Sequence, residues 1–263
     1  MKVVILAGGY GTRLSEETDV KPKPMVEIGG MPILWHIMKI YSHYGFNEFL
    51  ICLGYKGFAI KQFFDHYFLH ESDVTFDFSK GNERIIHGHS AEPWKVTLVD
   101  TGLNTMTGGR VKRIQQYVKN ETFMLTYGDG VADVNISKLL NFHQSHGKKV
   151  TVTAVQPAGR FGVIDIDADN SVSNFWEKPK TEASWVSGGF FVMEPGIFSY
   201  IKDDNTILEK TPLVVIAKEG ELKAYKHAGF WQCMDKLSDK MLLEELWASG
   251  KAPWRLWKNK THD

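Results

Sequence analysis

The feature that most constrains this fold is an apolar strand that runs directly into a glycine-rich loop near the amino terminus. VVILA occupies residues 3–7, and GGYG follows at residues 8–11. Consecutive backbone N–H groups in such a loop can surround an anion, and glycine lets the backbone approach a phosphate closely with positive φ. The sequence therefore predicts a phosphate site at the end of a first, buried strand.

Strand and helix patterns then alternate along the first half of the chain. Apolar runs at 48–53 and 123–127 predict strands, and periodic segments at 32–44, 56–69 and 136–146 predict helices. Strands separated by helices predict βαβ units and a parallel sheet. The segment from 71 to 110 holds glycines and short strand-like pieces without helical period, so we interpret it as an inserted flap.

The second half of the chain is richer in strands. After residue 149 come VTVTAV, FGVIDID, SVSNFWEKP and VSGGFFVM, and helical patterns follow near 208–218 and 236–248. We expect an α/β fold with one Rossmann-like, mixed and mostly parallel sheet flanked by helices, together with a small β-rich portion. The 263 residues are expected to form a single domain.

Composition excludes several classes of partner. The chain has 31 basic and 31 acidic residues, so it lacks the net charge that nucleic acid or an anionic membrane attracts. No apolar run reaches the length of a transmembrane helix, and the first residues do not resemble a signal peptide. We expect a cytoplasmic protein that binds neither nucleic acid nor membrane, so any phosphate site must be local.

The glycine-rich loop does not match the common phosphate-binding motifs. A Walker motif needs Gly-Lys-Ser/Thr where this chain has Gly11, Thr12 and Arg13, and a dinucleotide motif needs glycine where it has Leu14. Lys23 follows between two prolines, which stiffen the backbone that carries it. Cations beside a glycine loop favour a triphosphate or a leaving pyrophosphate, and the alternative is an ordinary solvated turn.

Five segments resemble one enzyme family, the sugar-phosphate nucleotidylyltransferases. They are LAGGYGTRL with KPKPM, YGDGVAD at 127–133, FWEKPK at 175–180, VSGGFFVM at 186–193 and FWQCMD at 230–235. Longer stretches, including GGMPILWHIMKIYSHYG and EPWKVTLVDTG, resemble the members that use CTP and α-D-glucose 1-phosphate and release pyrophosphate. The resemblance implies a nucleotide-binding half over about 1–148, with the flap at about 71–110, and a sugar-binding half over about 149–263.

The reaction of this family needs positive charge more than it needs a base, because the attacking sugar phosphate is already anionic. Arg13 and Lys23 are expected to neutralise the phosphates, and Asp129, in the turn GDG, completes the predicted catalytic set. The residues predicted to bind the nucleotide are Leu6, Ala7, Gly8, Gly9, Gly11, Thr12, Arg13, Lys23, Thr105, Arg110 and Gly128.

A magnesium ion and a sugar site complete the prediction. Asp129 and Asp235 supply the one or two carboxylates that Mg²⁺ prefers, although Asp235 could instead cap the helix that follows it. The resemblance implies that the sugar phosphate is bound by Glu177, Lys178, Gly188, Gly189 and Trp231. For the two glycines a β-bulge is the alternative, and for Trp231 a place in the core.

Two other functions stay open on the sequence alone. One is a uridylyl- or thymidylyltransferase that acts on a hexose 1-phosphate, because only contacts to the base separate it from an enzyme that uses CTP. The other is a nucleotide-binding regulatory subunit that has lost catalysis, which the presence of Arg13, Lys23, Asp129 and Asp235 disfavours. We further expect a homo-oligomer, with the flap or the aromatic tail LWASGKAPWRLWKNK at the interface.

Overall fold

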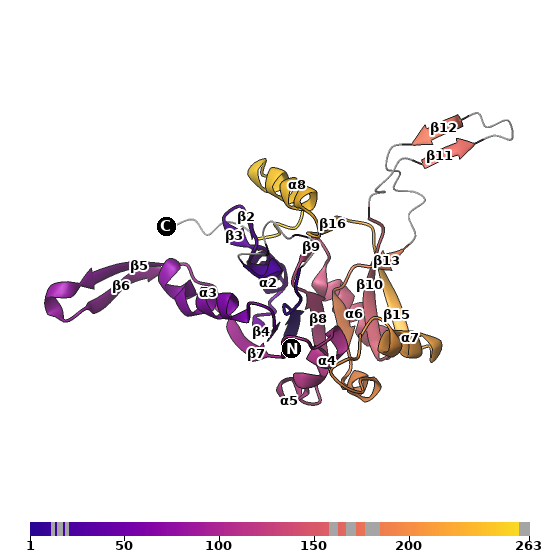
Figure 1. Ribbon diagram of the computed structural model, residues 1–263, viewed down its shortest axis with the longest axis horizontal. Helices are drawn as coiled ribbons and strands as arrows, with labels where there is room; N and C mark the ends of the chain where they lie inside the picture. Colours follow the sequence, from indigo (N-terminus) through magenta and orange to yellow (C-terminus); the bar gives the residue numbers. More distant parts are fainter. Residues whose placement is uncertain are drawn as a thin grey trace.

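A central sheet of eight strands organises the chain (Figure 1). The computed structural model describes residues 1–11, 14, 18, 21–157 and 185–257, and the backbone of 163–166 and 172–176. From one edge the strands are β15 (Leu222–His227), β10 (Val150–Val155), β14 (Phe191–Met193) with β13 (Val186–Ser187), β8 (Phe123–Tyr127), β1 (Val3–Leu6), β4 (Glu48–Leu53) and β7 (Lys95–Asp100).

The sheet is mostly parallel, as the βαβ pattern predicts. β8, β1, β4 and β7 pair in parallel, and β15 pairs in parallel with β10. β14 runs antiparallel between β8 and β10, and β13 continues this pairing with β10. The amino-terminal and carboxy-terminal parts of the chain are therefore joined in one mixed sheet, which confirms the predicted fold class.

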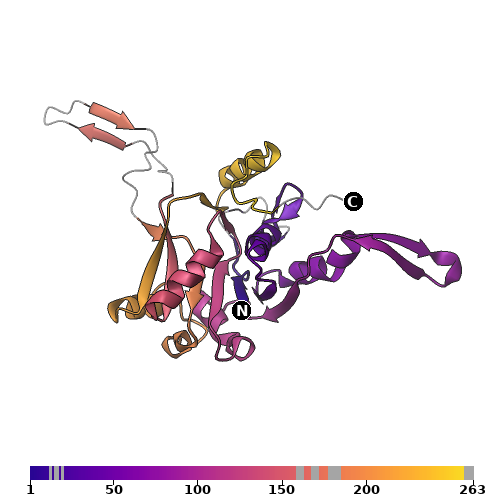
Figure 2. The same ribbon diagram turned by 180° about the vertical axis from the view of Figure 1, so that it is seen from behind.

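Helices cover both faces of the sheet because successive strand residues point to opposite sides. Val3 and Ile5 pack beneath α2 (Ile33–His43), α3 (Gly57–His70), α6 (Ile136–His146) and α8 (Leu237–Ala248). Val4 and Leu6 pack on the other face with α4 (Thr107–Arg113), α5 (Gln115–Val118), the turn η4 (Pro195–Tyr200) and α7 (Thr211–Lys218). Figure 2 shows α6 in front of the sheet, on the first of these faces.

Two hairpins project from the body at opposite ends (Figure 1). β5 (Ser72–Asp77) and β6 (Glu83–His89), joined through η3 (Phe78–Lys80), extend beyond α3. β11 (Val163–Ile166) and β12 (Val172–Trp176) pair only with each other among the described strands, so these two predicted strands lie outside the central sheet.

The predicted flap over 71–110 is too long. The projecting part is the hairpin at 72–89, because Lys95–Asp100 form β7, the edge strand of the central sheet, and Thr107–Arg113 form α4. The sequence obscured this because β7 alternates apolar and polar residues, as an edge strand does, and because two glycines lie in the first turn of α4.

None of the helices in the described part of the chain has the length and apolar character that a membrane span requires.

Candidate active site

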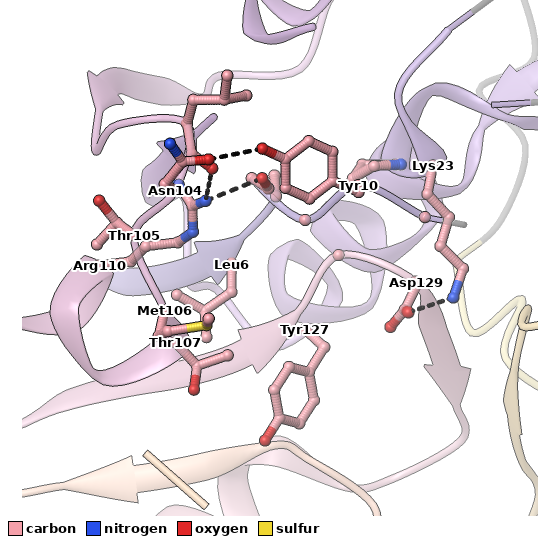
Figure 3. Close-up of a pocket in the computed structure, with 17 residues that line it drawn as sticks. Leu6, Tyr10, Lys23, Asn104, Thr105, Met106, Thr107, Arg110, Tyr127 and Asp129 are labelled. Atoms are coloured by element: carbon pink, nitrogen blue, oxygen red, sulfur yellow. Dashed lines mark hydrogen bonds and ion pairs between the residues drawn. The ribbon is translucent and has the colours of Figure 1, made fainter. Parts of the chain in front are cut away.

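Lys23, Asp129 and Asp235 lie in direct contact although they are far apart in the sequence. The Lys23 Nζ donates to Asp129 Oδ2 and to Asp235 Oδ1, both at 2.6 Å. The lysine and Asp235 side chains are about one-tenth exposed, whereas that of Asp129 is 29% exposed. We call these three residues the charge junction; Figure 3 shows its Lys23–Asp129 half.

The backbone around each member fixes the junction. Lys23 begins a short turn, η2 (Lys23–Met25), held between Pro22 and Pro24. Asp129 follows β8, at the carboxyl end of a parallel strand, where α/β folds bind ligands. Its backbone carbonyl accepts from Met234 N at 2.8 Å, which brings the residue before Asp235 alongside it.

Two short strands and a helix start hold Asp235. β9 (Gly130–Ala132) and β16 (Trp231–Cys233) pair antiparallel, with Gly130 opposite Cys233. The Asp239 carboxylate accepts from the backbone N–H groups of Asp235 and Lys236 at 2.9 Å each. Asp239 therefore caps α8, and the Asp235 carboxylate is directed instead toward Lys23.

The electrostatics of the junction keep Lys23 charged. Burial alone lowers the pKa of Lys23, but the charges and hydrogen bonds of Asp129 and Asp235 outweigh it and raise the pKa above its ordinary value. Cys233 lies beside the junction, and burial together with Asp235 raises the pKa of its thiol to about 12. This thiol stays protonated at neutral pH, so Cys233 is a poor nucleophile there.

A cavity of about 530 Å³ opens on one side of the junction (Figure 3). Every residue predicted to bind the nucleotide that the structure describes lines it: Leu6, Ala7, Gly8, Gly9, Gly11, Lys23, Thr105, Arg110 and Gly128. Asp129 completes the wall next to Lys23. The volume suits a nucleotide-sized ligand.

The glycines of the loop have distinct structural reasons. Gly11 has φ of +67°, a conformation that side chains disfavour. At Gly8 a Cβ would lie 2.3 Å from Arg110 Nη1, whereas nothing lies within 4 Å of a Cβ at Gly9. Gly9 therefore presents open backbone to the cavity, as a phosphate cradle requires.

Arg110 lines the cavity, but its terminal nitrogens already hold the surrounding loops together. Nη1 donates to Leu53 O, Thr101 Oγ1 and Gly102 O at 2.8–2.9 Å, and Nη2 donates to Gly8 O at 3.0 Å. Burial lowers the pKa of Arg110 below its ordinary value. Arg110 thus has a structural role: it fixes the carbonyl of Gly8 and with it the glycine-rich loop.

A second cavity, of about 310 Å³, opens on the other side of the junction. Of the predicted sugar-site residues, Gly188 and Trp231 line it, and Trp231 Nε1 donates to Gly188 O at 2.8 Å. Gly189 does not line it but has φ of +75° and packs against the Tyr127 ring. Tyr127 and Asp129 line both cavities, so the two spaces meet at the junction.

The junction also suits a divalent cation. One ammonium faces two carboxylates, so these three groups together carry a net negative charge, and carboxylate oxygens are the ligands that Mg²⁺ prefers. Among the described residues, no group of three or more His, Cys, Asp or Glu side chains is arranged to hold a metal. A two-carboxylate site that also uses water and substrate phosphates matches the usual way in which proteins bind magnesium.

Four of the predicted site residues lie outside the described residues: Thr12, Arg13, Glu177 and Lys178. Their roles stay predictions from the sequence. Conversely, the sequence reasoning missed several residues that line the cavities, namely Tyr10, Leu103, Asn104, Met106, Thr107, Tyr127 and Ser187. Tyr10, Tyr127 and Ser187 lie within motifs that the sequence analysis identified. The others flank the predicted residue Thr105, and that adjacency was the only signal available for them.

Comparison with known proteins gives concordant results. The sequence profile of the family described as nucleotidyl transferase matches residues 2–232. The glucose-1-phosphate cytidylyltransferase of Salmonella typhi is 58% identical over 98% of this chain and 100% of its own length. The probable glucose-1-phosphate cytidylyltransferase of Bacillus subtilis is 43% identical over 98% and 100%.

Solved structures support the fold alone, because their identities are low. The crystal structure of HddC from Yersinia pseudotuberculosis has a TM-score of 0.67 at 23% identity, covering 94% of this chain and 99% of that one. Apo UDP-glucose pyrophosphorylase has a TM-score of 0.68 at 17% identity, covering 95% and 98%.

Proposed function

Because this chain belongs to the nucleotidyl transferase family, we propose that it is an enzyme that transfers a cytidylyl group from CTP to α-D-glucose 1-phosphate. The products are CDP-glucose and pyrophosphate. An oxygen of the sugar phosphate attacks the α-phosphorus of CTP, and the bond from that phosphorus to the oxygen bridging to the β-phosphate breaks. The identity to the two cytidylyltransferases supports the choice of substrates.

The observation that carries this proposal is the meeting of two cavities at one lysine and two carboxylates. CTP would occupy the larger cavity, where the glycine-rich loop offers backbone N–H groups to its phosphates. The sugar would occupy the smaller one, against Gly188 and Trp231. The two phosphates that react would then lie at the boundary that Tyr127 and Asp129 share.

Catalysis in such a site consists of positioning and charge neutralisation. Lys23 keeps its charge, since its pKa is raised, and its ammonium can move from the carboxylates toward the phosphates. Asp129 and Asp235 would hold Mg²⁺, which, when bound, neutralises charge on the phosphate oxygens. We also assign Arg13 to the triphosphate, and Glu177 and Lys178 to the sugar phosphate, on the motifs that contain them.

Selection of cytosine depends on the 4-position of the base, where cytosine has an amino group and uracil a carbonyl. The loop that contains Thr105 lines the nucleotide cavity and can direct backbone carbonyls toward that amino group. Pyrophosphate release should be measured with each of the four NTPs and dTTP together with glucose 1-phosphate. CTP should exceed UTP by at least about tenfold in kcat/KM, the scale of one well-placed hydrogen bond.

Each outcome of this assay separates the candidate functions. Equal use of CTP and UTP would contradict the cytidylyl assignment, and preference for UTP or dTTP would establish the uridylyl- or thymidylyltransferase alternative. Absence of pyrophosphate with every nucleotide, while CTP still binds, would identify a regulatory subunit instead.

Exposed apolar side chains on the projecting hairpin support the proposal that the chain forms a homo-oligomer. Phe78, in the connecting turn η3, is 78% exposed, and Ile85 and Ile86 on β6 are each more than 40% exposed. The two strands of this hairpin pair with no other described strand. An isolated two-stranded hairpin is marginally stable in water, so a second copy of the chain is the expected cover. Trp254, in the aromatic tail, is 1% exposed within its own chain, so its ring is not available for an interface. The mass in solution, measured by light scattering, should exceed that of one chain and fall in Phe78→Asp.

A further inference from the structure

Glu209, just before α7, accepts a hydrogen bond from each of two side chains that line the proposed nucleotide cavity. The Tyr127 hydroxyl donates to Glu209 Oε1 at 2.5 Å, and the Thr107 hydroxyl donates to Glu209 Oε2 at 2.6 Å. The two oxygens of one carboxylate therefore join the last residue of β8 to the first residue of α4.

Each of these partners is attached to a part of the site. Thr107 lines the nucleotide cavity, and its Oγ1 also accepts from Leu208 N at 2.9 Å, so the donation of its hydrogen to Glu209 has a fixed direction. Tyr127 lines both cavities and precedes Asp129 by two residues. Figure 3 shows Tyr127 and Thr107 on the same side of the nucleotide cavity, away from Lys23.

The far side of the Tyr127 ring contacts the sugar-site loop. Gly189 has φ of +75°, and a Cβ there would lie 3.0 Å from Tyr127 Cδ2. At the end of the ring, the Tyr127 hydroxyl donates to Glu209 Oε1. The Tyr127 ring is thus held by Glu209 at its hydroxyl and by Gly189 along its edge.

The loop that carries Glu209 is fixed to α4 without help from this carboxylate. Met106 N donates to Asp204 O at 2.8 Å, and Arg113 forms an ion pair with Asp204. At Gly108 a Cβ would lie 2.6 Å from Thr206 O, so helix and loop are in direct contact. Removal of the Glu209 side chain should therefore release Tyr127 and Thr107 while the loop stays in place.

We propose that Glu209 is a positioning residue: through Tyr127 and Thr107 it fixes the position of the nucleotide cavity relative to the sugar cavity. This inference rests on the proposed function. Without the carboxylate, the Tyr127 ring and the Thr107 side chain each lose one of the contacts that fix their orientation. Binding of both substrates should weaken together, because the Tyr127 ring forms part of both walls.

The test compares Glu209→Ala with Glu219→Ala. Glu219 is a matched control, because its carboxylate accepts from the Tyr200 hydroxyl near the other end of α7 and lines neither cavity. Two lost hydrogen bonds to a carboxylate should reduce kcat/KM about tenfold in Glu209→Ala, with KM raised for both the nucleotide and the sugar phosphate. Glu209→Gln, which keeps one acceptor oxygen, should fall between Glu209→Ala and the wild type.

A double-mutant cycle separates positioning from a general loss of stability. Tyr127→Phe should reduce kcat/KM in the wild-type background but by less than about twofold in Glu209→Ala, because the two groups act through one bond. The proposal is overturned if Glu209→Ala behaves like Glu219→Ala, or if the Tyr127→Phe loss is repeated in full without Glu209. If Glu209→Ala does not fold, the same cycle is run with Glu209→Gln.

Failure of the double-mutant cycle can be distinguished from failure of the proposed function. It is measured with whichever nucleotide the wild-type protein turns over fastest, so preference for a nucleotide other than CTP contradicts the proposed function alone. If no nucleotide is turned over, the affinity for CTP with Mg²⁺, measured by calorimetry, replaces kcat/KM in every comparison.

Discussion

Two buried lysine–carboxylate clusters in the described part of the chain differ in composition and in surroundings. In the charge junction, Lys23 binds two carboxylates and lines the larger cavity, and Asp129 lines both cavities. In the second cluster, Lys39 Nζ lies 2.5 Å from Glu92 Oε1, and the Tyr67 hydroxyl donates to Glu92 Oε2. The rings of Trp35 and Trp257 lie 5.2 and 5.5 Å from the Lys39 ammonium.

Charge balance and access to a cavity distinguish a structural ion pair from one that can take part in a reaction. Around Lys39 the charges balance, both Glu92 oxygens are used, and aromatic rings close the space. At the junction the negative charge is in excess, and Asp129 is partly exposed to two cavities. In a balanced, closed pair, removal of one partner leaves a buried charge uncompensated and destabilises the fold. An unbalanced pair beside a cavity can instead receive a cationic or phosphate ligand.

The largest expected effect is the loss of turnover in Lys23→Met. Removing one preorganised cation from a site of this kind costs about 10²–10³-fold in kcat. Steady-state rates of pyrophosphate release, with circular dichroism as the check on folding, measure it. Lys39→Met is the matched variant, and equal rate losses in the two variants would erase the distinction drawn between the clusters.

Loss of either carboxylate should come next. We expect Asp129→Asn and Asp235→Asn to reduce magnesium-dependent turnover by about 10²-fold, with Asp129→Asn the more severe, because asparagine keeps the size but removes the charge. Excess Mg²⁺ should restore Asp235→Asn in part. An Asp129→Asn enzyme with unchanged kcat and an unchanged Mg²⁺ titration would show that any ion is held elsewhere.

The second cluster should respond in stability and leave turnover intact. Lys39→Met leaves the Glu92 carboxylate, whose side chain is 8% exposed, without its cation. Breaking a buried pair in this way typically costs about 3 kcal/mol or more, which urea unfolding can measure. The rate of pyrophosphate release should stay within about twofold of wild type.

The pH dependence of stability should also originate in this second region. His36 contacts Trp35 and Trp257, and burial lowers its pKa to about 4 from 6.5. Between these values the unfolded chain binds a proton that the folded chain does not, so stability falls as the pH drops from 6.5 toward 4, by about 1.4 kcal/mol per pH unit at most.

A single substitution assigns this dependence to His36. His36 Nε2 donates to Ile28 O at 2.8 Å, and glutamine can keep that donor without titrating. The slope of unfolding free energy against pH in His36→Gln should therefore be shallower by about one proton over the same range. An unchanged slope would assign the effect to another group.

The smallest effect is expected at the rim of the nucleotide cavity. The Tyr10 hydroxyl donates to Asn104 Oδ1 at 2.8 Å, and Tyr10 is 45% exposed. An exposed hydrogen bond contributes little, so Tyr10→Phe should change the KM for CTP by less than about twofold. A larger change would mean that this contact takes part in binding the base.

Much of the first half of the fold was accessible from the sequence, because its signals are local. The helix over 136–146 and the strand over 123–127 match the structure residue by residue. β7 was missed because a strand at the sheet edge carries no continuous apolar run, and the register of β14 between β8 and β10 depends on long-range pairing.

The site was accessible only as a set of motifs. GDG and KPKP indicate charged groups near phosphates, yet nothing local reveals that Lys23 lies 2.6 Å from both Asp129 and Asp235. Glu209 belongs to no motif and enters the site only through the packing of its loop against α4. The guanidinium of Arg110 was expected to meet the nucleotide, and the protein acceptors to which it donates could not be deduced from spacing.

A crystal structure with CDP-glucose and Mg²⁺ would show whether the phosphates of the product bind at the charge junction. We expect the cytidine in the cavity of the glycine-rich loop, the glucose beside Gly188 and Trp231, and the two phosphates next to Lys23 and Asp129. A metal ion bound to Asp129 and Asp235 should accompany them. A diphosphate bound away from the Lys23 ammonium, with the junction unchanged, would contradict the account.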